Sequence, residues 1–323
     1  MVHEKSKKPE LEQSEVIEEM PLACSTERAA VEFFEAKRWG DCPCCPHCGD
    51  TDVYTMKDRK TGDRNKDFRW RCRGCGSLYS VRTGMIFEES LIPLHKWARA
   101  IWEAASGKNG VSALEISRKC QISYKSALFV MHRLRHAMAD DFTSPPKLTG
   151  TIECDETYIG GKPRYRGKSK RGRGTKKQPV VAVLQRGGIV RTRVIPVVNA
   201  ENVKTMIREN VAKSARICTD SESSYRGIGA QYRGGHHSVN HGAGEYVRGD
   251  VTTNAVEGFF ARVKRGMKGV YHNVSREHLF RYMDQFEFAH NTRKMNDGER
   301  VLSLIDKADG KRLRYREPGK KAG

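Results

Sequence analysis

The sequence predicts a mixed α/β sheet with flanking helices, preceded by a small metal-binding ribbon and a helical segment. Two Cys-x-x-Cys-Gly motifs lie between residues 42 and 76. From about residue 94 to 140, apolar residues recur every three or four positions, which is typical of helices. After residue 150, short apolar runs separated by polar turns indicate strands. These three patterns follow one another along the chain, so we expect one module for each.

Composition restricts the kind of partner that this protein binds. The chain has 323 residues, enough for two or three domains, and 59 Lys and Arg against 39 Asp and Glu give a formal charge of +20. This excess is typical of proteins that bind polyanions, so nucleic acid is the leading candidate; a charge that serves only solubility is the alternative. No apolar run is long enough to span a membrane, and the N-terminus does not resemble a signal peptide. We therefore expect a cytoplasmic, nucleoid-associated protein.

Shifts in composition and periodicity predict the domain boundaries. Both ends of the chain are polar, and we expect the N-terminal segment to be mobile and the C-terminal one to be a basic tail. The predicted modules are a mobile segment (1–25), a zinc ribbon (26–88), a helical DNA-binding segment (89–145), a sheet domain (146–306) and a basic tail (307–323).

The cysteines predict a structural zinc site. Six of the ten lie between residues 42 and 75, and a cytosolic chain is not expected to hold them as disulfides. Cys45 with Cys48, and Cys72 with Cys75, form two knuckles that supply four thiolates for a tetrahedral zinc ion. Cys42 lies close enough to substitute for Cys45, as does Cys44. The segment between the knuckles is predicted to form two strands joined by a polar turn, as in a zinc ribbon.

The helical segment has the outline of a helix-turn-helix. Ser112 and Ser123 are in position to cap the two helices, and Lys125 and Arg133 are candidate DNA contacts. A plain helical bundle that supports the ribbon predicts much the same pattern, so this alternative stays open.

After residue 150, the order of elements indicates a ribonuclease-H-like fold. Strands are predicted near residues 150–161, 180–186 and 190–198, then a helix over 200–213 and a fourth strand that ends near residue 220. In this fold, a first carboxylate lies on the first strand and a second at the end of the fourth. This order therefore identifies where an acidic site should be sought.

Because side chains alternate along a strand, the acids of the first strand are divided between its two faces. Glu153 and Asp155 share one face, and Glu156 lies on the other. Asp220 ends the fourth strand, and we predict that it meets Asp155 across adjacent strands. Glu153 and Glu222 are kept as supporting candidates. Two neighbouring carboxylates repel each other unless a divalent cation lies between them, and their oxygen ligands suit Mg²⁺ or Mn²⁺.

A third ligand is expected from an amphipathic helix over residues 252–269. Its apolar stripe leaves Asn254, Glu257, Lys264 and Lys268 together on the opposite side. An acid with a lysine two turns further on suits a phosphate lying across the helix. An ordinary solvated face is the alternative.

A basic run over residues 162–178 follows the first strand and is predicted to be a loop that grips the phosphate backbone. Loops of this composition are also common as hairpin tips without a binding role. The candidate DNA contacts in this run are Lys162, Arg164, Arg166, Lys168, Lys170, Arg171, Arg173 and Lys176.

Several motifs together resemble a known family. "CPHCG", "WRCRGCG", "ECDETYIGGK", "CTDSESSYRG" and "TTNAVEGFFARVKRGMKG" are similar to motifs of the bacterial insertion-sequence transposases of the family numbered fifteen-ninety-five, the ISXO-like enzymes. The resemblance extends from about residue 27 to about residue 305. It implies a DDE transposase with an N-terminal zinc ribbon, a helical DNA-binding segment and a ribonuclease-H-like catalytic domain.

The resemblance also implies roles for individual residues. It places the first two catalytic carboxylates at Asp155 and Asp220. The third position of the family is an acid or an asparagine followed by a lysine, and this chain has both Asn254 and Glu257, with Lys264 downstream. We favour Glu257 as the metal ligand, because a carboxylate binds a hard cation more strongly than an amide oxygen, and expect Asn254 to be a helix cap or an auxiliary contact.

The implied reaction is cleavage of phosphodiester bonds at transposon ends, followed by attack of the 3′-hydroxyl on target DNA with two metal ions. The implied partner is double-stranded DNA, both terminal inverted repeats and target, bound by a homo-oligomer. Two alternatives remain: a non-catalytic DNA-binding regulator, such as a decayed transposase, and a structure-specific nuclease on the same fold.

Overall fold

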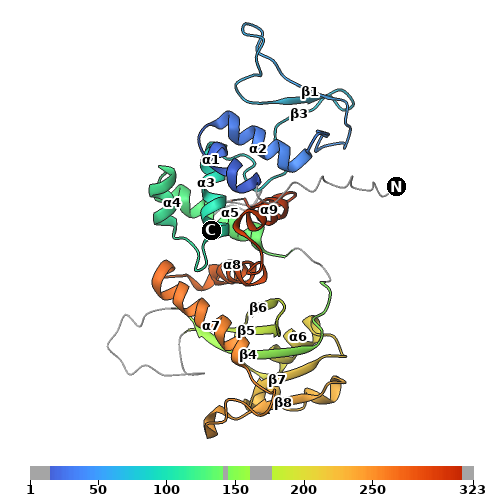
Figure 1. The fold of residues 1–323 in the computed structure, drawn as a ribbon, viewed down its shortest axis with the longest axis vertical. Helices are drawn as coiled ribbons and strands as arrows, with labels where there is room; N and C mark the ends of the chain where they lie inside the picture. Colours follow the sequence, from blue (N-terminus) through green and yellow to red (C-terminus); the bar gives the residue numbers. More distant parts are fainter. Residues whose placement is uncertain (1–14, 141–144, 161–176, 315–323) are drawn as a thin grey trace, which may run out of the picture. The chain divides into compact units, whose positions relative to one another are not determined.

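The computed structural model describes residues 15–140, 145–160 and 177–314 (Figure 1). The chain divides into two compact units. The first contains residues 1–107, 113–138 and 295–323, and the second contains residues 108–112 and 139–294. Within the described ranges, every helix falls short of the length and apolarity that crossing a bilayer requires.

The first unit begins with a small antiparallel sheet. Strands β1 (Val53–Thr55), β2 (Trp70–Cys72) and β3 (Leu78–Tyr79) pair in the order β1-β2-β3. The predicted pair of strands between the two cysteine knuckles is thus confirmed. Trp39, at the end of helix α2 (Glu27–Trp39), packs edge-on against Trp70 and Tyr79, with ring centroids 5.8 and 5.9 Å away. These aromatic contacts join the ribbon to the helix that precedes it.

The helices of the first unit pack around a shared apolar core. They are α1 (Glu15–Ala23), α2, α3 (Leu94–Ser106), α4 (Ala113–Cys120), α5 (Tyr124–Met138) and α9 (Asp297–Ala308). Phe34 of α2 and Trp97 of α3 meet on either side of Phe87, and all three side chains are buried. Helices α4 and α5 are joined by a three-residue turn, and Ser123 Oγ caps α5 at the Ser126 amide, 3.1 Å away. The predicted helix-turn-helix outline is therefore present.

Two segments differ from the predicted division of the chain. Helix α1 lies within residues 1–25, which we expected to be mobile. Helix α9 groups with the helices of the first unit, whereas the sequence placed it in a sheet domain ending at residue 306. A capping box between Asn296 and Glu299 starts α9, and its buried residues Val301, Leu304 and Ile305 supply an apolar face. Such a face can cover any neighbouring core, so periodicity alone does not reveal which one.

The second unit contains a five-stranded mixed sheet. Its strands are β4 (Thr151–Ile159), β5 (Gln178–Gln185), β6 (Val190–Val194), β7 (Arg216–Asp220) and β8 (His236–Val239). They are ordered β6-β5-β4-β7-β8; β5 is antiparallel to both of its neighbours, β6 and β4, and β4, β7 and β8 run parallel. This is the strand order of the ribonuclease-H-like fold, which confirms the predicted fold class.

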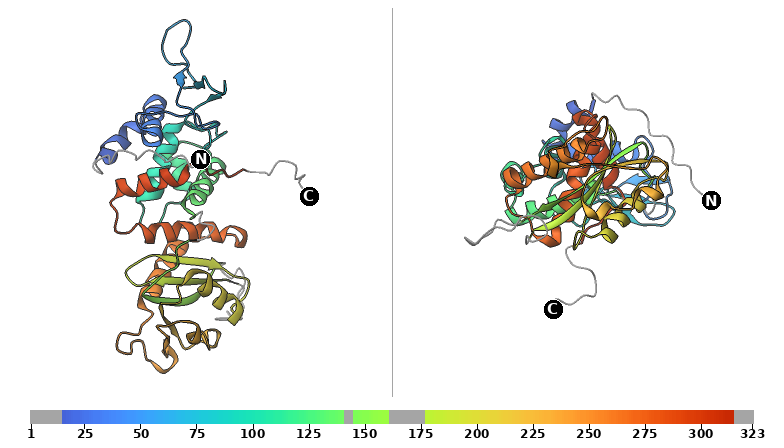
Figure 2. Two further views of the ribbon diagram at one scale, coloured as in Figure 1. Left: turned by 90° about the vertical axis from the view of Figure 1, so that its right-hand side faces the viewer. Right: turned by 90° about the horizontal axis from the view of Figure 1, so that it is seen from below.

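Helices cover both faces of this sheet (Figures 1 and 2). On one face, Val203, Met206 and Ile207 of α6 (Ala200–Asn210) pack on alternate residues of β4, β5 and β7. On the other, α7 (Asn254–Gly266) and α8 (Leu279–Asn291) pack on the remaining residues of β5. The two faces of β4 are therefore covered by different helices.

Helix α8 also protects the edge of the sheet. Asn291 accepts a hydrogen bond from the Val190 amide of β6 at 2.8 Å and donates one to the carbonyl of the same residue at 3.1 Å. One turn earlier, Glu287 accepts from the Thr192 amide at 2.6 Å. These side chains satisfy backbone groups that an edge strand would otherwise expose.

Candidate active site

The acids of β4 are divided between the two faces of the sheet as the alternation predicted. Ile152 and Cys154 are buried in the core beneath α6, so Glu156 shares their face. Glu153 and Asp155 pair with Leu184 and Ala182 of β5, which belong to the core beneath α7. Glu153 and Asp155 therefore lie on the α7 side of the sheet.

Asp155 and Asp220 lie on adjacent parallel strands. The register pairs Ile152 with Ile217 and Glu153 with Cys218, and extending it by two residues brings Asp155 beside Asp220. The Asp155 carboxylate accepts a hydrogen bond from the Glu156 amide at 2.8 Å, and the Asp220 carboxylate accepts one from the Glu222 amide at 3.1 Å. Each carboxylate is thus held by a nearby backbone amide, Asp155 in the middle of β4 and Asp220 at the end of β7.

The three predicted acids lie close enough to interact electrostatically, and this interaction affects the pKa of Asp155. Burial, the neighbouring Glu156, and then Asp220 and Glu257 raise the pKa of Asp155 to about 7. Like charges near a carboxylate disfavour its ionised form, and burial acts in the same direction. Asp155 therefore lies where negative charge from β4, β7 and α7 accumulates.

The carboxylate oxygens of the three acids are not within metal-binding distance of one another in this structure. In the described part of the chain, the one group of three or more ligand atoms within 4.8 Å of one another is formed by cysteines. The Glu257 carboxylate instead accepts a hydrogen bond from the Thr253 hydroxyl at 2.6 Å. Asp155, Asp220 and Glu257 thus share one region at a wider spacing.

Helix α7 presents the predicted polar side. Val256, Phe259, Phe260 and Val263 are buried, whereas Asn254 and Lys264 are exposed and Glu257 is half-buried. Lys268 is also exposed, in the π-helical segment Met267–Tyr271 that follows α7. The predicted apolar stripe and the exposed side of this helix are therefore both present.

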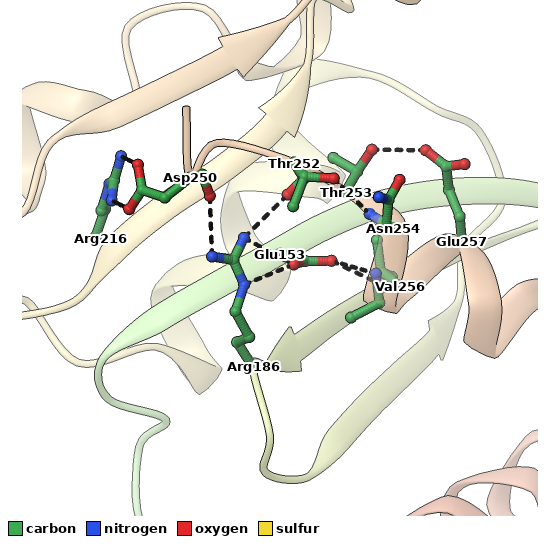
Figure 3. Close-up of polar contacts among 10 residues, drawn as sticks. Glu153, Arg186, Arg216, Asp250, Thr252, Thr253, Asn254, Val256 and Glu257 are labelled. Atoms are coloured by element: carbon green, nitrogen blue, oxygen red, sulfur yellow. Dashed lines mark hydrogen bonds and ion pairs between the residues drawn. The ribbon is translucent and has the colours of Figure 1, made fainter. Parts of the chain in front are cut away.

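The cap of α7 differs from the one expected. Asn254 is the first helical residue, and the N-cap position belongs to Thr253, whose side chain caps no helix amide. The carboxylate of Glu153 takes that role from β4: its Oε2 accepts from the amides of Ala255 at 2.8 Å and Val256 at 3.1 Å (Figure 3). The expectation that Asn254 caps the helix is thus wrong, because an acid about one hundred residues earlier fills the position.

Arg186, directly after β5, completes this contact. Its guanidinium donates to Glu153 Oε1 at 2.9 Å and to the carbonyls of Asp250 and Thr252 at 3.0 and 3.3 Å (Figure 3). Asp250 in turn forms a two-bonded ion pair with Arg216, the first residue of β7. The segment that leads into α7 is therefore tied to the sheet from both sides of β4.

The four knuckle cysteines converge in the first unit. Sγ atoms of Cys45 and Cys75, and those of Cys48 and Cys72, are 3.6 Å apart, and all four lie within 4.8 Å of one another. A tetrahedral zinc ion with bonds of about 2.3 Å needs sulfur atoms about 3.8 Å apart. The cluster therefore has the composition and spacing of a structural zinc site, and Cys42 and Cys44 are not part of it.

Comparisons with known proteins give the family. A family model described as an ISXO2-like transposase domain matches residues 147–291, and one described as a transposase zinc-ribbon domain matches residues 25–77. The chain belongs to the ISXO2-like transposase family.

One similar protein also comes from a transposable element. The transposase is 26% identical over 297 residues to an uncharacterized protein in transposable element ISH50 of Halobacterium salinarum, and the match covers 88% of this chain and 97% of that protein. Among solved structures, a Mos1 transposase paired-end complex with left transposon end is 13% identical over 62% of this chain and 71% of that chain, with a TM-score of 0.28. A pre-cleavage Mos1 transpososome is 11% identical over 92% and 93%, with a TM-score of 0.27. These scores are too low to support an inference.

The predicted DNA contacts differ in their exposure to solvent. Lys125 is exposed in the first turn of α5. Arg133 is only 5% exposed, and its guanidinium donates to the carbonyls of Ile86 at 2.6 Å and Glu88 at 2.9 Å. In this structure Arg133 therefore holds a loop to α5 and is not at the surface. The eight basic candidates between Lys162 and Lys176 lie outside the described residues.

The sequence did not predict two residues whose side chains contact acids of β4. Arg186 ends a predicted strand in "LQRGG", where an arginine is normally solvated. Tyr225, in "SESSYRG", is completely buried, and its hydroxyl donates to Glu156 at 2.7 Å. Their positions depend on contacts with β4 that are distant in sequence, and no local pattern signals them.

Proposed function

We propose that this protein is a DNA transposase that binds the ends of its insertion sequence, cleaves phosphodiester bonds there, and joins the freed 3′-hydroxyl ends to target DNA. The observation that carries this proposal is the placement of Asp155 and Asp220 on adjacent parallel strands, with Glu257 on the helix that covers the same face. A protein that only binds DNA has no need for three acids gathered beside the cationic side of a helix.

The chemistry of these acids suits divalent cations. The raised pKa of Asp155 reflects burial and carboxylate repulsion, and the positive charge of a cation between the acids would offset both effects. Asp155, Asp220 and Glu257 offer the oxygen donors that Mg²⁺ and Mn²⁺ prefer, so we propose them as the ligands. When bound, two such ions activate the attacking oxygen and stabilise the leaving oxygen of an in-line displacement.

The side chains around the acids bind and orient the DNA. Lys264 is seven residues beyond Glu257 on α7, about 10 Å along the helix, and it is exposed. We propose that Lys264 and Lys268 contact phosphates on either side of the bond to be cut. Asn254, exposed at the start of the same helix, is an auxiliary contact to the DNA. Lys125 is proposed to contact DNA from the first unit.

Residues outside the acidic site have supporting roles in this proposal. The four-cysteine cluster binds one zinc ion and fixes the fold of the ribbon. The excess of basic residues draws the protein to double-stranded DNA, both terminal repeats and target, in the cytoplasm beside the nucleoid. A homo-oligomer holds the two ends of the element. We propose the domain limits predicted above for the ribbon and the helical segment, with the catalytic domain ending near Lys294.

One experiment tests the function. Purified full-length protein is incubated with DNA carrying the repeats that flank its own gene, in Mg²⁺ or Mn²⁺, and the products are sequenced. A transposase yields cut ends and ends joined to new sites. Cutting without joining would indicate a structure-specific nuclease instead, and binding with neither reaction would indicate a regulator. Each of these two results would overturn the proposal.

A further inference from the structure

The carboxylate of Glu153 is almost completely buried, with 1% of the residue exposed. Burying a carboxylate is costly unless its oxygens are hydrogen-bonded, and both oxygens of Glu153 are. One accepts from the first-turn amides of α7, and the other accepts from Arg186 (Figure 3). With its lone pairs directed at a helix and a guanidinium, Glu153 is poorly placed to be a metal ligand as well.

The first turn of α7 depends on this distant acid. The amides at the start of a helix have no partner within the helix, and the residue at the N-cap usually supplies one. In α7, the N-cap residue Thr253 forms no side-chain cap bond, and its hydroxyl donates to Glu257. The Asn254 amide donates to the Thr252 hydroxyl at 3.2 Å, and the next two amides donate to Glu153. The negative charge of Glu153 also lies at the positive end of the helix dipole.

The position of this contact connects two of the proposed ligands. Glu153 is two residues before Asp155 on the same face of β4, so their side chains project about 7 Å apart. Its partner Val256 immediately precedes Glu257. Arg186 adds bonds to the carbonyls of Asp250 and Thr252, which lead into the helix. The strand with Asp155 and the helix with Glu257 are therefore joined through one carboxylate.

We infer that Glu153 and Arg186 form a clamp that sets the position of Glu257 relative to Asp155, and that Glu153 is a positioning residue. This inference rests on the proposed function. Ligands must be held within a few tenths of an ångström to bind a metal ion well, and partners that orient ligands typically change metal affinity about 10- to 100-fold when removed. The clamp supplies that constraint, because Glu153 accepts from the amides of Ala255 and Val256 directly before this ligand.

The test is Glu153→Gln, which preserves size but breaks the clamp. Glutamine has one acceptor oxygen, so its amide group must face either the helix amides or the guanidinium, all of which are donors. We expect faster hydrogen exchange in the peptide covering residues 250–260. We also expect the Mg²⁺ concentration for half-maximal cleavage to rise about 10- to 100-fold, with activity regained at high metal. Asp155→Asn, in contrast, stays inactive at every concentration.

Three further variants serve as controls for this test. Arg186 is one-third exposed, so Arg186→Gln is expected to fold and to shift the exchange and the metal requirement in the same direction; it replaces Glu153→Gln if that variant does not fold. The double variant should be no worse than the stronger single one, because both changes remove the same clamp. Glu209→Gln, which alters the exposed ion pair with Arg193 in the same unit, should leave both measurements unchanged.

The outcomes separate the clamp from the function. Unchanged hydrogen exchange in Glu153→Gln and Arg186→Gln would overturn the clamp. A Glu153→Gln variant with normal hydrogen exchange that is inactive at all metal concentrations would also overturn it, because a metal ligand behaves in this way. An unchanged metal requirement would overturn the positioning role. If the wild-type protein does not cleave, the proposed function fails, and the positioning role, which rests on it, fails with it; the exchange comparison still decides whether the clamp holds α7.

Discussion

The hydroxyl of Tyr225 donates a hydrogen bond to Glu156 Oε2 at 2.7 Å, on the face of β4 opposite Asp155. Tyr225 is completely buried, five residues after Asp220. Burial, and then the adjacent Glu156, raise the pKa of this tyrosine well above its usual value, so it remains a donor. The bond ties the segment that follows Asp220 to the strand that carries Asp155.

Tyr225→Phe should therefore destabilise the sheet unit. Removing a hydrogen bond between a buried hydroxyl and a half-buried carboxylate costs about 1–3 kcal/mol, which lowers the melting temperature by roughly 2–4 °C for each kcal/mol in a unit of this size. Thermal unfolding followed by circular dichroism measures it. Tyr124→Phe, at an exposed position, serves as the control. Equal melting temperatures for the two variants would mean that the bond contributes nothing.

Asp155→Asn and Asp220→Asn should reduce cleavage and joining below detection, while binding to transposon-end DNA is retained. Each change removes a proposed metal ligand and also one negative charge, which favours DNA binding slightly. Electrophoretic mobility shifts and cleavage of labelled ends measure the two properties separately. A variant that still cuts at ordinary Mg²⁺ concentration would be removed from the catalytic set.

Glu257 and Asn254 are one turn apart on α7, and the expected ranking of their variants is clear. Glu257→Gln should eliminate strand transfer, because a neutral amide replaces the carboxylate that contributes to the field around Asp155. Asn254→Ala should only weaken it, since Asn254 is exposed and does not cap the helix. Joined products are counted by sequencing. The reverse ranking would assign the third ligand to the asparagine.

Much of the sheet unit was predictable because its signals are local. Strand alternation places Glu153 and Asp155 on one face, and the order of strands and helix brings Asp155 beside Asp220. The apolar stripe of α7 was likewise evident from periodicity. Each of these features depends on residues that are neighbours in sequence or on a strand order that has few alternatives.

The features that escaped prediction depend on partners distant in sequence. Arg133 occupies a helical position where an arginine is normally solvated, and its bonds to the carbonyls of Ile86 and Glu88 compensate for its burial. The role of Glu153 depends on amides about one hundred residues later. In both cases a buried charged side chain is hydrogen-bonded to backbone groups distant in sequence, whose positions the residue pattern does not encode.

The cysteine cluster should bind about one zinc ion per chain. Cys72→Ser removes a buried ligand of the closed site, so zinc content should fall to near zero and the ribbon should lose its fold. Cys42→Ser changes an exposed cysteine outside the cluster and should keep the metal. Metal analysis of the purified variants distinguishes them. Full zinc in Cys72→Ser would require a different ligand set.

Glu287 makes the stability of the sheet unit depend on pH. This carboxyl of α8 accepts from the amide and the hydroxyl of Thr192. Burial is the main cause that raises its pKa to about 8. The folded state then binds a proton that the unfolded state releases above its ordinary pKa of about 4.5, so stability is highest below that value. The contribution of Glu287 declines as the pH rises from about 4.5 to 8.

Glu287→Gln should remove this decline. Glutamine keeps an acceptor oxygen for Thr192 and does not ionise, so the variant should become more stable than the wild type as the pH rises from 5 to 8. We expect the difference in melting temperature to widen by at least roughly 3 °C over this range, measured by calorimetry at constant ionic strength. Glu209→Gln, at an exposed ion pair, should follow the wild-type curve. Parallel curves for Glu287→Gln and wild type would show that Glu287 is already ionised in the folded protein, held as a carboxylate by its bonds to β6.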